Sequence, residues 1–530
     1  MAFPISPEGR FHTPEFIFRE KDGVFVAIDR DRANWICLNR SGMQIVQALP
    51  GKTVEEAASE CVAAGVLSSE EPEKHLRKFA ADLARKEFLS TTPITGELVA
   101  RAEILKPEKL HEVWIVTNFE CNMACRHCYT YERVAGDRRR VGKDALLAMM
   151  DECRRLGAEV FYLTGGEPLL REDLFDLIEG ATRRSRAILF TNGTLVTPGW
   201  AEHLSRYRER LVVQVSMEGP DEESNSVVRG AGSFARAMEG IRTLLRAGLR
   251  VGVSSTPTPR TASRVPELTR LLAGTSEGKH GVEYHHIIYV VHAGNAREGD
   301  TARLTTTDLI DVVTRCKEAI RQAKQEGVKT RLKITNDKIF EAIASNGPRK
   351  DMCGAGYTIL GINADGMLHP CATTMHDTSF NLGTLIDDQG NYVPGEIGRL
   401  WRESAAVQRI RSFTVLARGG GKVTDLRFFH GGGCWYHMQD QQGDIRAEHP
   451  FYEAYETLTE KAILHVATKD IQEGDRTKEA PRPKIYSSMA RTRISCAGVR
   501  KIPFALTSPP VGGVSEFDGA QPMKYSLVSR

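Results

Sequence analysis

The stretch Cys121-Asn122-Met123-Ala124-Cys125-Arg126-His127-Cys128 holds three cysteines at the spacing C-x3-C-x2-C. It closely follows an apolar segment, residues 113–117 (VWIVT), which has the composition of a β-strand. The thiols therefore stand on a loop at the carboxyl end of a predicted strand. Iron–sulfur clusters are usually held by four cysteine thiolates. Three thiolates on one short loop predict a cluster with one iron open to a ligand from outside the protein.

Two simpler interpretations exist for these cysteines. A structural zinc ion takes a closed set of four ligands, typically two C-x2-C pairs, and no second pair lies nearby. The alternative of three unrelated buried thiols does not explain their spacing on one loop.

The composition is that of a globular chain without a strong global charge. Its 530 residues predict two to four domains, and 71 basic residues nearly balance 68 acidic ones, so we expect no nucleic-acid partner. No apolar run is long enough to cross a membrane, and the N-terminus lacks the pattern of a signal peptide. Eleven cysteines without a secretion signal indicate a cytoplasmic protein that binds metal.

The first 95 residues predict a small α+β unit. Short strands are expected at 16–18, 24–28 and 35–38, and helices at 42–48, 53–64 and 71–86. Thr53 and Glu56 have the spacing of a capping box, which predicts the start of the second helix.

Residues 110–330 alternate between strand and helix patterns. Strands are predicted at 113–117, 159–164, 187–191, 211–216, 250–255 and 283–291, with helices such as 143–156, 172–184 and 233–247 between them. This order predicts a parallel sheet with flanking helices, partly closed like a barrel. Beyond it, 346–455 is irregular and rich in Gly, Cys and His, and 456–530 reads as a weakly ordered tail with helix only at 450–468.

Polar or glycine-rich segments follow several of these strands. They are Thr164-Gly165-Gly166-Glu167-Pro168, then residues 191–194 with Asn192, residues 216–219 with Ser216 and Glu218, and residues 292–296. Each alone is most simply a turn. Because parallel strands end at one edge, we expect these tips to meet the cysteine loop. Glycines there would let a ligand approach the backbone.

At these residues the chain resembles the radical S-adenosylmethionine (SAM) superfamily. The resemblance implies that Cys121, Cys125 and Cys128 bind a [4Fe–4S] cluster whose open iron chelates SAM. It also implies that Gly165, Gly166 and Glu167 hold the methionine end and that Ser216 and Glu218 contact the ribose, while Asn192 and Arg229 line the same mouth. Reductive cleavage would then give a 5′-deoxyadenosyl radical.

A second cysteine set is Cys353-x12-Gly366-x4-Cys371, followed by Cys434. It resembles the auxiliary-cluster domain of peptide-modifying radical enzymes, called SPASM in its full form and twitch in its shorter form. The cysteines that the family uses for a second auxiliary cluster are missing here, so the resemblance implies one auxiliary cluster held by Cys353, Cys371 and Cys434. Its fourth ligand stays open between His430, Cys496, water and a substrate thiol. The alternative is a degenerate domain without metal.

The N-terminal unit resembles the leader-recognition element related to the pyrroloquinoline quinone peptide chaperone, a winged-helix unit that takes up a peptide as an added strand. Its last helix carries five basic residues that would suit an acidic leader: Lys74, Arg77, Lys78, Arg85 and Lys86. A winged helix also suggests DNA binding, which the neutral chain disfavours. Cys37, Cys61, Cys153 and Cys316 fall on apolar faces and are expected in the core, whereas the role of Cys496 stays open.

Together these features predict an α/β chain with a partial (β/α)6 TIM-like barrel, an N-terminal winged-helix α+β domain and a C-terminal iron–sulfur domain. The predicted activity is modification of a ribosomally made precursor peptide, most simply a thioether or carbon–carbon cross-link, with a flavodoxin or ferredoxin as electron donor. Alternatives are a peptide epimerase, an enzyme of haem or quinone cofactor synthesis, and an inactive leader-binding scaffold.

Overall fold

The computed structural model describes residues 9–94 (except 22, 32 and 33), 109–129, 140–297 (except 289, 292 and 293), 304–335, 354–412, 426–474 (except 432, 446, 448, 450 and 451) and 485–488. Cys353, Cys496 and two residues of the predicted tip at 292–296, His292 and Ala293, lie outside these residues. Among the helices described, none is long and apolar enough to span a bilayer.

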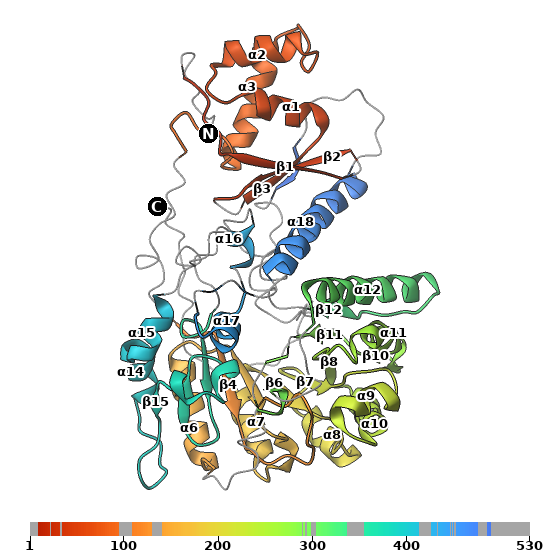
Figure 1. Cartoon of the computed structure of the whole chain (residues 1–530), viewed down its shortest axis with the longest axis vertical. Helices are drawn as coiled ribbons and strands as arrows, with labels where there is room; N and C mark the ends of the chain where they lie inside the picture. Colours follow the sequence, from red (N-terminus) through yellow and green to blue (C-terminus); the bar gives the residue numbers. More distant parts are fainter. Residues whose placement is uncertain are drawn as a thin grey trace, which may run out of the picture.

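The N-terminal unit is an antiparallel sheet covered by three helices (Figure 1). Its elements are β1 (Phe16–Lys21), β2 (Val24–Asp29), β3 (Asn34–Leu38), α1 (Arg40–Ala48), α2 (Val54–Ala63) and α3 (Pro72–Arg85). The predicted capping box is present: the Thr53 side chain accepts from the Glu56 amide, and the Glu56 carboxylate accepts from the Thr53 amide. The three strands and three helices follow one another in the predicted order.

The two faces of this sheet are both buried, against different layers. Ile36 and Leu38 pack with the helices α1–α3, whereas Trp35 and Cys37 pack with residues of the C-terminal region, including Ile463. Because alternate residues of a strand point to opposite faces, β3 is apolar at nearly every position.

A second sheet, with ten strands in the described residues, forms the body of the molecule in the order β12-β11-β8-β7-β6-β5-β4-β13-β14-β15. Neighbours from β12 to β13 pair in parallel. The strands are β4 (Glu112–Val116), β5 (Val160–Thr164), β6 (Arg186–Thr191), β7 (Leu211–Ser216), β8 (Arg250–Ser255), β11 (Tyr284–Ile287), β12 (Lys333–Thr335), β13 (Ile359–Ile362), β14 (Met367–His369) and β15 (Gly383–Thr384). The six predicted strands are all present, the last one shorter than expected.

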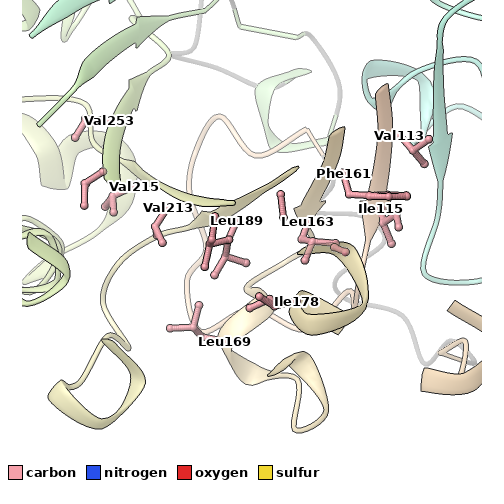
Figure 2. Packing of buried hydrophobic residues seen from close by; sticks show 14 of the residues in the cluster. Val113, Ile115, Phe161, Leu163, Leu169, Ile178, Leu189, Val213, Val215 and Val253 are labelled. Carbon is pink, nitrogen blue, oxygen red and sulfur yellow. The ribbon is translucent and has the colours of Figure 1, made fainter. Parts of the chain in front are cut away.

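Helices cover this sheet, and their apolar faces form its core with the strands (Figure 2). The helices are α6 (Lys143–Arg155), α7 (Leu174–Thr182), α8 (Pro198–Ser205), α9 (Glu222–Arg229), α10 (Ser233–Arg246), α11 (Val265–Gly274) and α12 (Thr306–Gln325). Strand side chains such as Ile115, Leu163 and Leu189 meet Ile178 of α7 in this core. A separate hairpin comprises β9 (Ser276–Glu277) and β10 (His280–Gly281).

The region 346–455 is more regular than expected. β13 pairs in parallel with β4 and, through β14 and β15, extends the barrel sheet at its cysteine-bearing edge. The helices α14 (Glu396–Glu403), α15 (Ala405–Arg411), α16 (Arg427–His430) and α17 (Trp435–Gln442) follow. The prediction of an irregular region was therefore wrong for these residues.

The C-terminal part returns to the N-terminal sheet. Helix α18 (Tyr452–Gly474), shown in blue in Figure 1, runs from the barrel side to that sheet and packs against it through Ile463 and Ala467. Beyond it, β16 (Ile485–Ser488) pairs with β3. The expectation of helix alone in this tail is corrected by β16, which is too short to be recognised by periodicity.

Candidate functional site

The cysteine loop leaves the carboxyl end of β4 and is fixed by backbone hydrogen bonds along its length. The Thr117 amide donates to the Thr164 carbonyl (2.7 Å), and the Arg126 amide donates to the Val228 carbonyl (2.9 Å). Asn295 donates from its amide to the Cys128 carbonyl (3.0 Å) and from its side chain to the Cys125 carbonyl (3.1 Å). The loop is thus held by segments at three other positions of the fold.

Burial separates the predicted ligands from the predicted core thiols. Cys121, Cys125 and Cys128 are partly exposed, as are Cys371 and Cys434, whereas Cys37, Cys61, Cys153 and Cys316 are buried as expected. Burial raises the pKa of the Cys121 thiol to about 11 and raises that of Cys125 as well, although the Arg229 guanidinium opposes the shift at Cys125. A metal must therefore displace protons from these thiols when it binds.

The described residues form no group of three His, Cys, Asp or Glu side chains that could hold a single metal ion. The loop cysteines therefore do not make a preformed single-ion zinc site with the residues described. They remain on one loop, close enough for Cys125 and Cys128 to influence the pKa of Cys121.

The two glycines after β5 lie directly against the cysteine loop. A Cβ on Gly166 would stand 2.3 Å from the Glu120 carbonyl oxygen and 2.4 Å from that of Phe119. A Cβ on Gly165 would stand 2.7 Å from the carbonyl oxygen of Asn118. The sequence predicted that these glycines let a ligand approach the backbone; the structure adds that they also let the start of the cysteine loop pack against this turn.

Glu167 ties the same turn to the end of β6. Its buried carboxylate accepts from the Asn192 amide (2.7 Å), the Thr191 hydroxyl (2.8 Å) and the Leu169 amide (3.1 Å). Burial raises the pKa of Glu167 to about 7, because loss of water outweighs these three hydrogen bonds, which favour the charged form.

Asn192 bridges β6 to the cysteine loop by side-chain hydrogen bonds. Its side-chain Nδ2 donates to Oδ1 of Asn122 (2.8 Å), and its side-chain Oδ1 accepts from the backbone amide of Thr194 (2.9 Å). The Asn122 amide in turn donates to the Thr194 hydroxyl (2.9 Å). The predicted tips of β5 and β6 therefore do meet the cysteine loop.

Glu218, after β7, is the centre of a buried charge cluster. Its carboxylate pairs with the Arg229 guanidinium (2.7 Å) and with His127 Nε2 (3.0 Å), and it accepts from the Thr256 amide (2.7 Å). Arg229 and His127 lower the pKa of Glu218 despite its full burial. The carboxylate is thus occupied by protein groups. Ser216, the other predicted ribose contact, lies half-buried at the end of β7.

The second cysteine set lies beside a different core. Cys371 and Cys434 both pack against the apolar cluster that includes Phe380, Trp435 and Tyr436. Half-buried Tyr129, which directly follows Cys128, has its pKa raised by desolvation and also by Cys128 and Cys371, so it lies near both cysteine sets. Its ring meets His376 at 5.6 Å, and Nε2 of His376 hydrogen-bonds the Tyr436 hydroxyl (2.7 Å).

His430, one predicted fourth ligand, already has a partner: its Nε2 pairs with the Glu456 carboxylate at 3.0 Å. Cys353 and Cys496 lie outside the described residues. Asn295 belongs to the predicted tip at 292–296, whereas Thr256, Tyr129 and His376 were missed by sequence reasoning, since each acts through a single side chain or amide with no motif. Only the adjacency of Tyr129 to Cys128 was a visible signal.

The predicted basic face of α3 is partly neutralised by its own helix and its N-cap. Lys74 pairs with Glu71 (2.7 Å), Arg77 with Glu73 (3.8 Å) and Arg85 with Asp82. The helix therefore offers less free positive charge to an acidic peptide than its sequence suggested.

A three-cysteine loop at the carboxyl edge of a partial parallel barrel, backed by a Gly-Gly-Glu-Pro turn, defines a radical SAM domain. Residues 115–270 match the family model of the Radical SAM superfamily. The match runs from the end of β4 through β8 and includes the cysteine loop, so this part of the chain is similar to the radical SAM core domain.

The proteins similar to this chain include maturases and heme synthases. The chain is 28% identical over 311 residues to the mycofactocin maturase MftC of Mycolicibacterium smegmatis, covering 55% of this chain and 71% of MftC. It is 26% identical over 362 residues to the AdoMet-dependent heme synthase of Nitratidesulfovibrio vulgaris, covering 64% of this chain and 90% of that enzyme.

Two solved structures share the fold. Native anSMEcpe with bound AdoMet aligns with a TM-score of 0.53 at 16% identity, over 68% of this chain and 99% of its own. Streptococcus suis SuiB bound to precursor peptide SuiA aligns with a TM-score of 0.51 at 14% identity, over 83% of this chain and 98% of its own.

Proposed function

We propose that the chain is a radical SAM peptide maturase that forms a thioether or carbon–carbon cross-link in a ribosomally made precursor. The observation that carries this proposal is the N-terminal sheet, which α18 fixes to the body of the enzyme and whose outer strand β3 accepts a further strand. Strand addition is a general way to bind an extended peptide. The relation to MftC and the extent of the match to SuiB support it.

In this proposal Cys121, Cys125 and Cys128 hold the [4Fe–4S] cluster. Its fit rests on their partial exposure and on the close packing of the glycines against their loop. When bound, a cluster with an open iron supplies the electron that cleaves SAM to methionine and a 5′-deoxyadenosyl radical. Glu167 would lie near the methionine ammonium. Burial raises the pKa of Glu167 to about 7, and a cation beside the carboxyl group would lower that pKa and favour the charged form.

Glu218 would have a positioning role. Its carboxylate orients His127 on the cysteine loop and keeps the buried Arg229 charge neutralised beside Cys125. Because a buried charge without a partner is costly, the pair is expected to fix this side of the loop.

Cys371 and Cys434, with Cys353, would hold one auxiliary cluster. Formation of a cross-link removes two hydrogen atoms from the peptide: the deoxyadenosyl radical takes one, and the second leaves as a proton and an electron. The auxiliary cluster is the acceptor that we propose for this electron. Two four-iron clusters would give about eight iron atoms per chain.

The first experiment reconstitutes the chain anaerobically with iron, sulfide and dithionite and measures 5′-deoxyadenosine released from SAM. We expect release by the wild type and none by Cys125→Ala. Equal release by both would overturn the assignment of the cysteine loop.

The auxiliary cluster is tested by counting iron. Cys371→Ala and Cys434→Ala should each lower iron from about eight to about four per chain, whereas Cys61→Ala, a thiol buried in the N-terminal unit, should leave it unchanged. About four iron atoms in the wild type, unaffected by either change, would eliminate this cluster.

The bond is tested by co-expression with short peptides encoded beside the gene. A cross-link lowers the peptide mass by about 2 Da, whereas an epimerase leaves the mass unchanged and introduces deuterium from D2O. A peptide that stays unmodified in cells producing the enzyme with its iron in place would contradict the maturase proposal.

A second function, tetrapyrrole synthesis, is favoured by the alignment to 90% of the heme synthase. It predicts deoxyadenosine formation that depends on a tetrapyrrole carboxylic acid and is indifferent to any peptide. The N-terminal sheet gives no reason for such a substrate, so we place this function second.

A further inference from the structure

The outer edge of β3 is occupied by the chain's own C-terminal segment. β16 (Ile485–Ser488) pairs antiparallel with β3, with Ile485 opposite Leu38 and Ser488 opposite Ile36. It therefore takes the position of a fourth strand in the order β1-β2-β3-β16. An edge strand with unpaired backbone groups is a template for a further strand, and here that template is filled from within.

Within the described residues, the pairing of β16 is shorter and less regular than that of the other strands in this sheet. β1 and β2 pair through six consecutive positions and β2 and β3 through five, without a break. β16 pairs at three positions, and its register shifts between Ile485 and Ser487. Pro481 and Pro483, which cannot donate backbone hydrogen bonds, precede it in the sequence.

By contrast, α18 is firmly attached to the same sheet. Ile463 and Ala467 pack with Trp35 and Cys37, and Glu460 pairs with Arg19 of β1 at 2.9 Å. Only ten residues separate Gly474 from Ile485. The helix therefore holds the tail close to the β3 edge, at an effective concentration of the order of millimolar.

We propose that residues 485–488 are a built-in occupant of the strand-addition edge of β3, and that an extended peptide binds by exchanging with them. This inference rests on the proposed function for the identity of the incoming peptide. Such a peptide adds antiparallel to β3. Its residues opposite Ile36 and Leu38 lie on the face that packs with α1–α3, so we expect them to be apolar.

The test uses the full chain, a chain ending at Gly474 and a fluorescent synthetic peptide of residues 481–492. Ending the chain there keeps α18 and its contacts with the sheet. We expect hydrogen exchange of the β3 amides to quicken on truncation. We also expect the peptide to bind the truncated chain at least about tenfold more tightly than the full chain, where the attached tail competes.

A point variant tests the same idea without truncation. Ser487→Pro within β16 should behave like the truncated chain, whereas Ser515→Pro, the same substitution elsewhere in the tail, should behave like the wild type. Equal β3 protection in all chains, with no peptide binding to the truncated one, would overturn the proposal.

The outcome is independent of the enzymatic assignment. Exchange rates and tail-peptide binding report on β16 alone, whereas deoxyadenosine release and peptide mass report on the proposed function. If a precursor peptide that the enzyme modifies binds the full and truncated chains with equal affinity, replacement of β16 by the peptide at β3 is refuted while the maturase function stands.

Discussion

Gly166→Ala is the most direct probe of how the turn after β5 supports the cysteine loop. The added methyl carbon would lie 2.3 Å and 2.4 Å from the carbonyl oxygens of Glu120 and Phe119. These are backbone atoms, so no side-chain rotation can relieve the contact. An ordinary contact of at least 3.4 Å requires the loop to withdraw by about 1 Å.

This displacement acts on the residues that precede Cys121. It lengthens the hydrogen bonds from the Gly166 amide to the Asn118 carbonyl (2.9 Å) and from the Glu167 amide to the Glu120 carbonyl (2.7 Å). Overpacking of this kind costs about 1–3 kcal/mol, so the domain should still fold. A misplacement of about 1 Å at a reacting centre can cost about 100-fold in rate.

The assay compares iron content, thermal stability and 5′-deoxyadenosine release with those of Gly199→Ala in α8, where the new methyl would meet only the Thr197 hydroxyl at 3.9 Å. We expect Gly199→Ala to match the wild type. For Gly166→Ala we expect a folded chain with a rate lower by about 100-fold. Full iron content and a wild-type rate in Gly166→Ala would refute the claim that this glycine positions the cysteine loop.

Two further predictions concern buried charge. Glu218→Gln leaves Arg229 buried without its ion-pair partner and should lower the free energy of unfolding, measured by urea titration, by about 3–5 kcal/mol. The control Glu239→Gln breaks an exposed ion pair with Arg246 and should change the free energy of unfolding little. Equal effects of the two substitutions would contradict the structural role of the Glu218–Arg229 pair. Burial lowers the pKa of His285 to about 3 from an ordinary 6.5, so the stability that neutral His285 contributes is complete above pH 6.5 and is lost as the pH falls towards 3. Urea titrations should show a loss of about 1.4 kcal/mol between pH 7.5 and 5.5 that His285→Gln removes, and an unchanged pH dependence in the variant would refute it.

The strand–helix alternation of the barrel was predictable because each strand is a short apolar run followed by an amphipathic helix. The six strands and the helices near 143–156 and 233–247 appear within a few residues of their predicted bounds. The meeting of the tips after β4, β5 and β6 followed from parallel topology alone. Thr53 and Glu56 show that a local motif with one physical outcome is readable directly.

What could not be predicted depends on contacts between distant residues. β13 and β16 are four residues each and gain their strand conformation by pairing with β4 and β3. The need for Gly166 arises from a backbone more than forty residues away in the sequence. The partners of Glu218 come from the cysteine loop, α9 and the segment after β8, so its sequence neighbours do not reveal that it is occupied.

One apolar cluster joins the N-terminal sheet to the second cysteine set. Val26 and Trp35 of the sheet share it with Phe380 and Trp435, and Cys371 and Cys434 pack against its border. Because interiors are close-packed and transmit displacements, a strand that binds at β3 acts on the same core that supports these thiols. Occupancy of the β3 edge is therefore expected to influence Cys371 and Cys434, the proposed ligands of an auxiliary cluster, through packing.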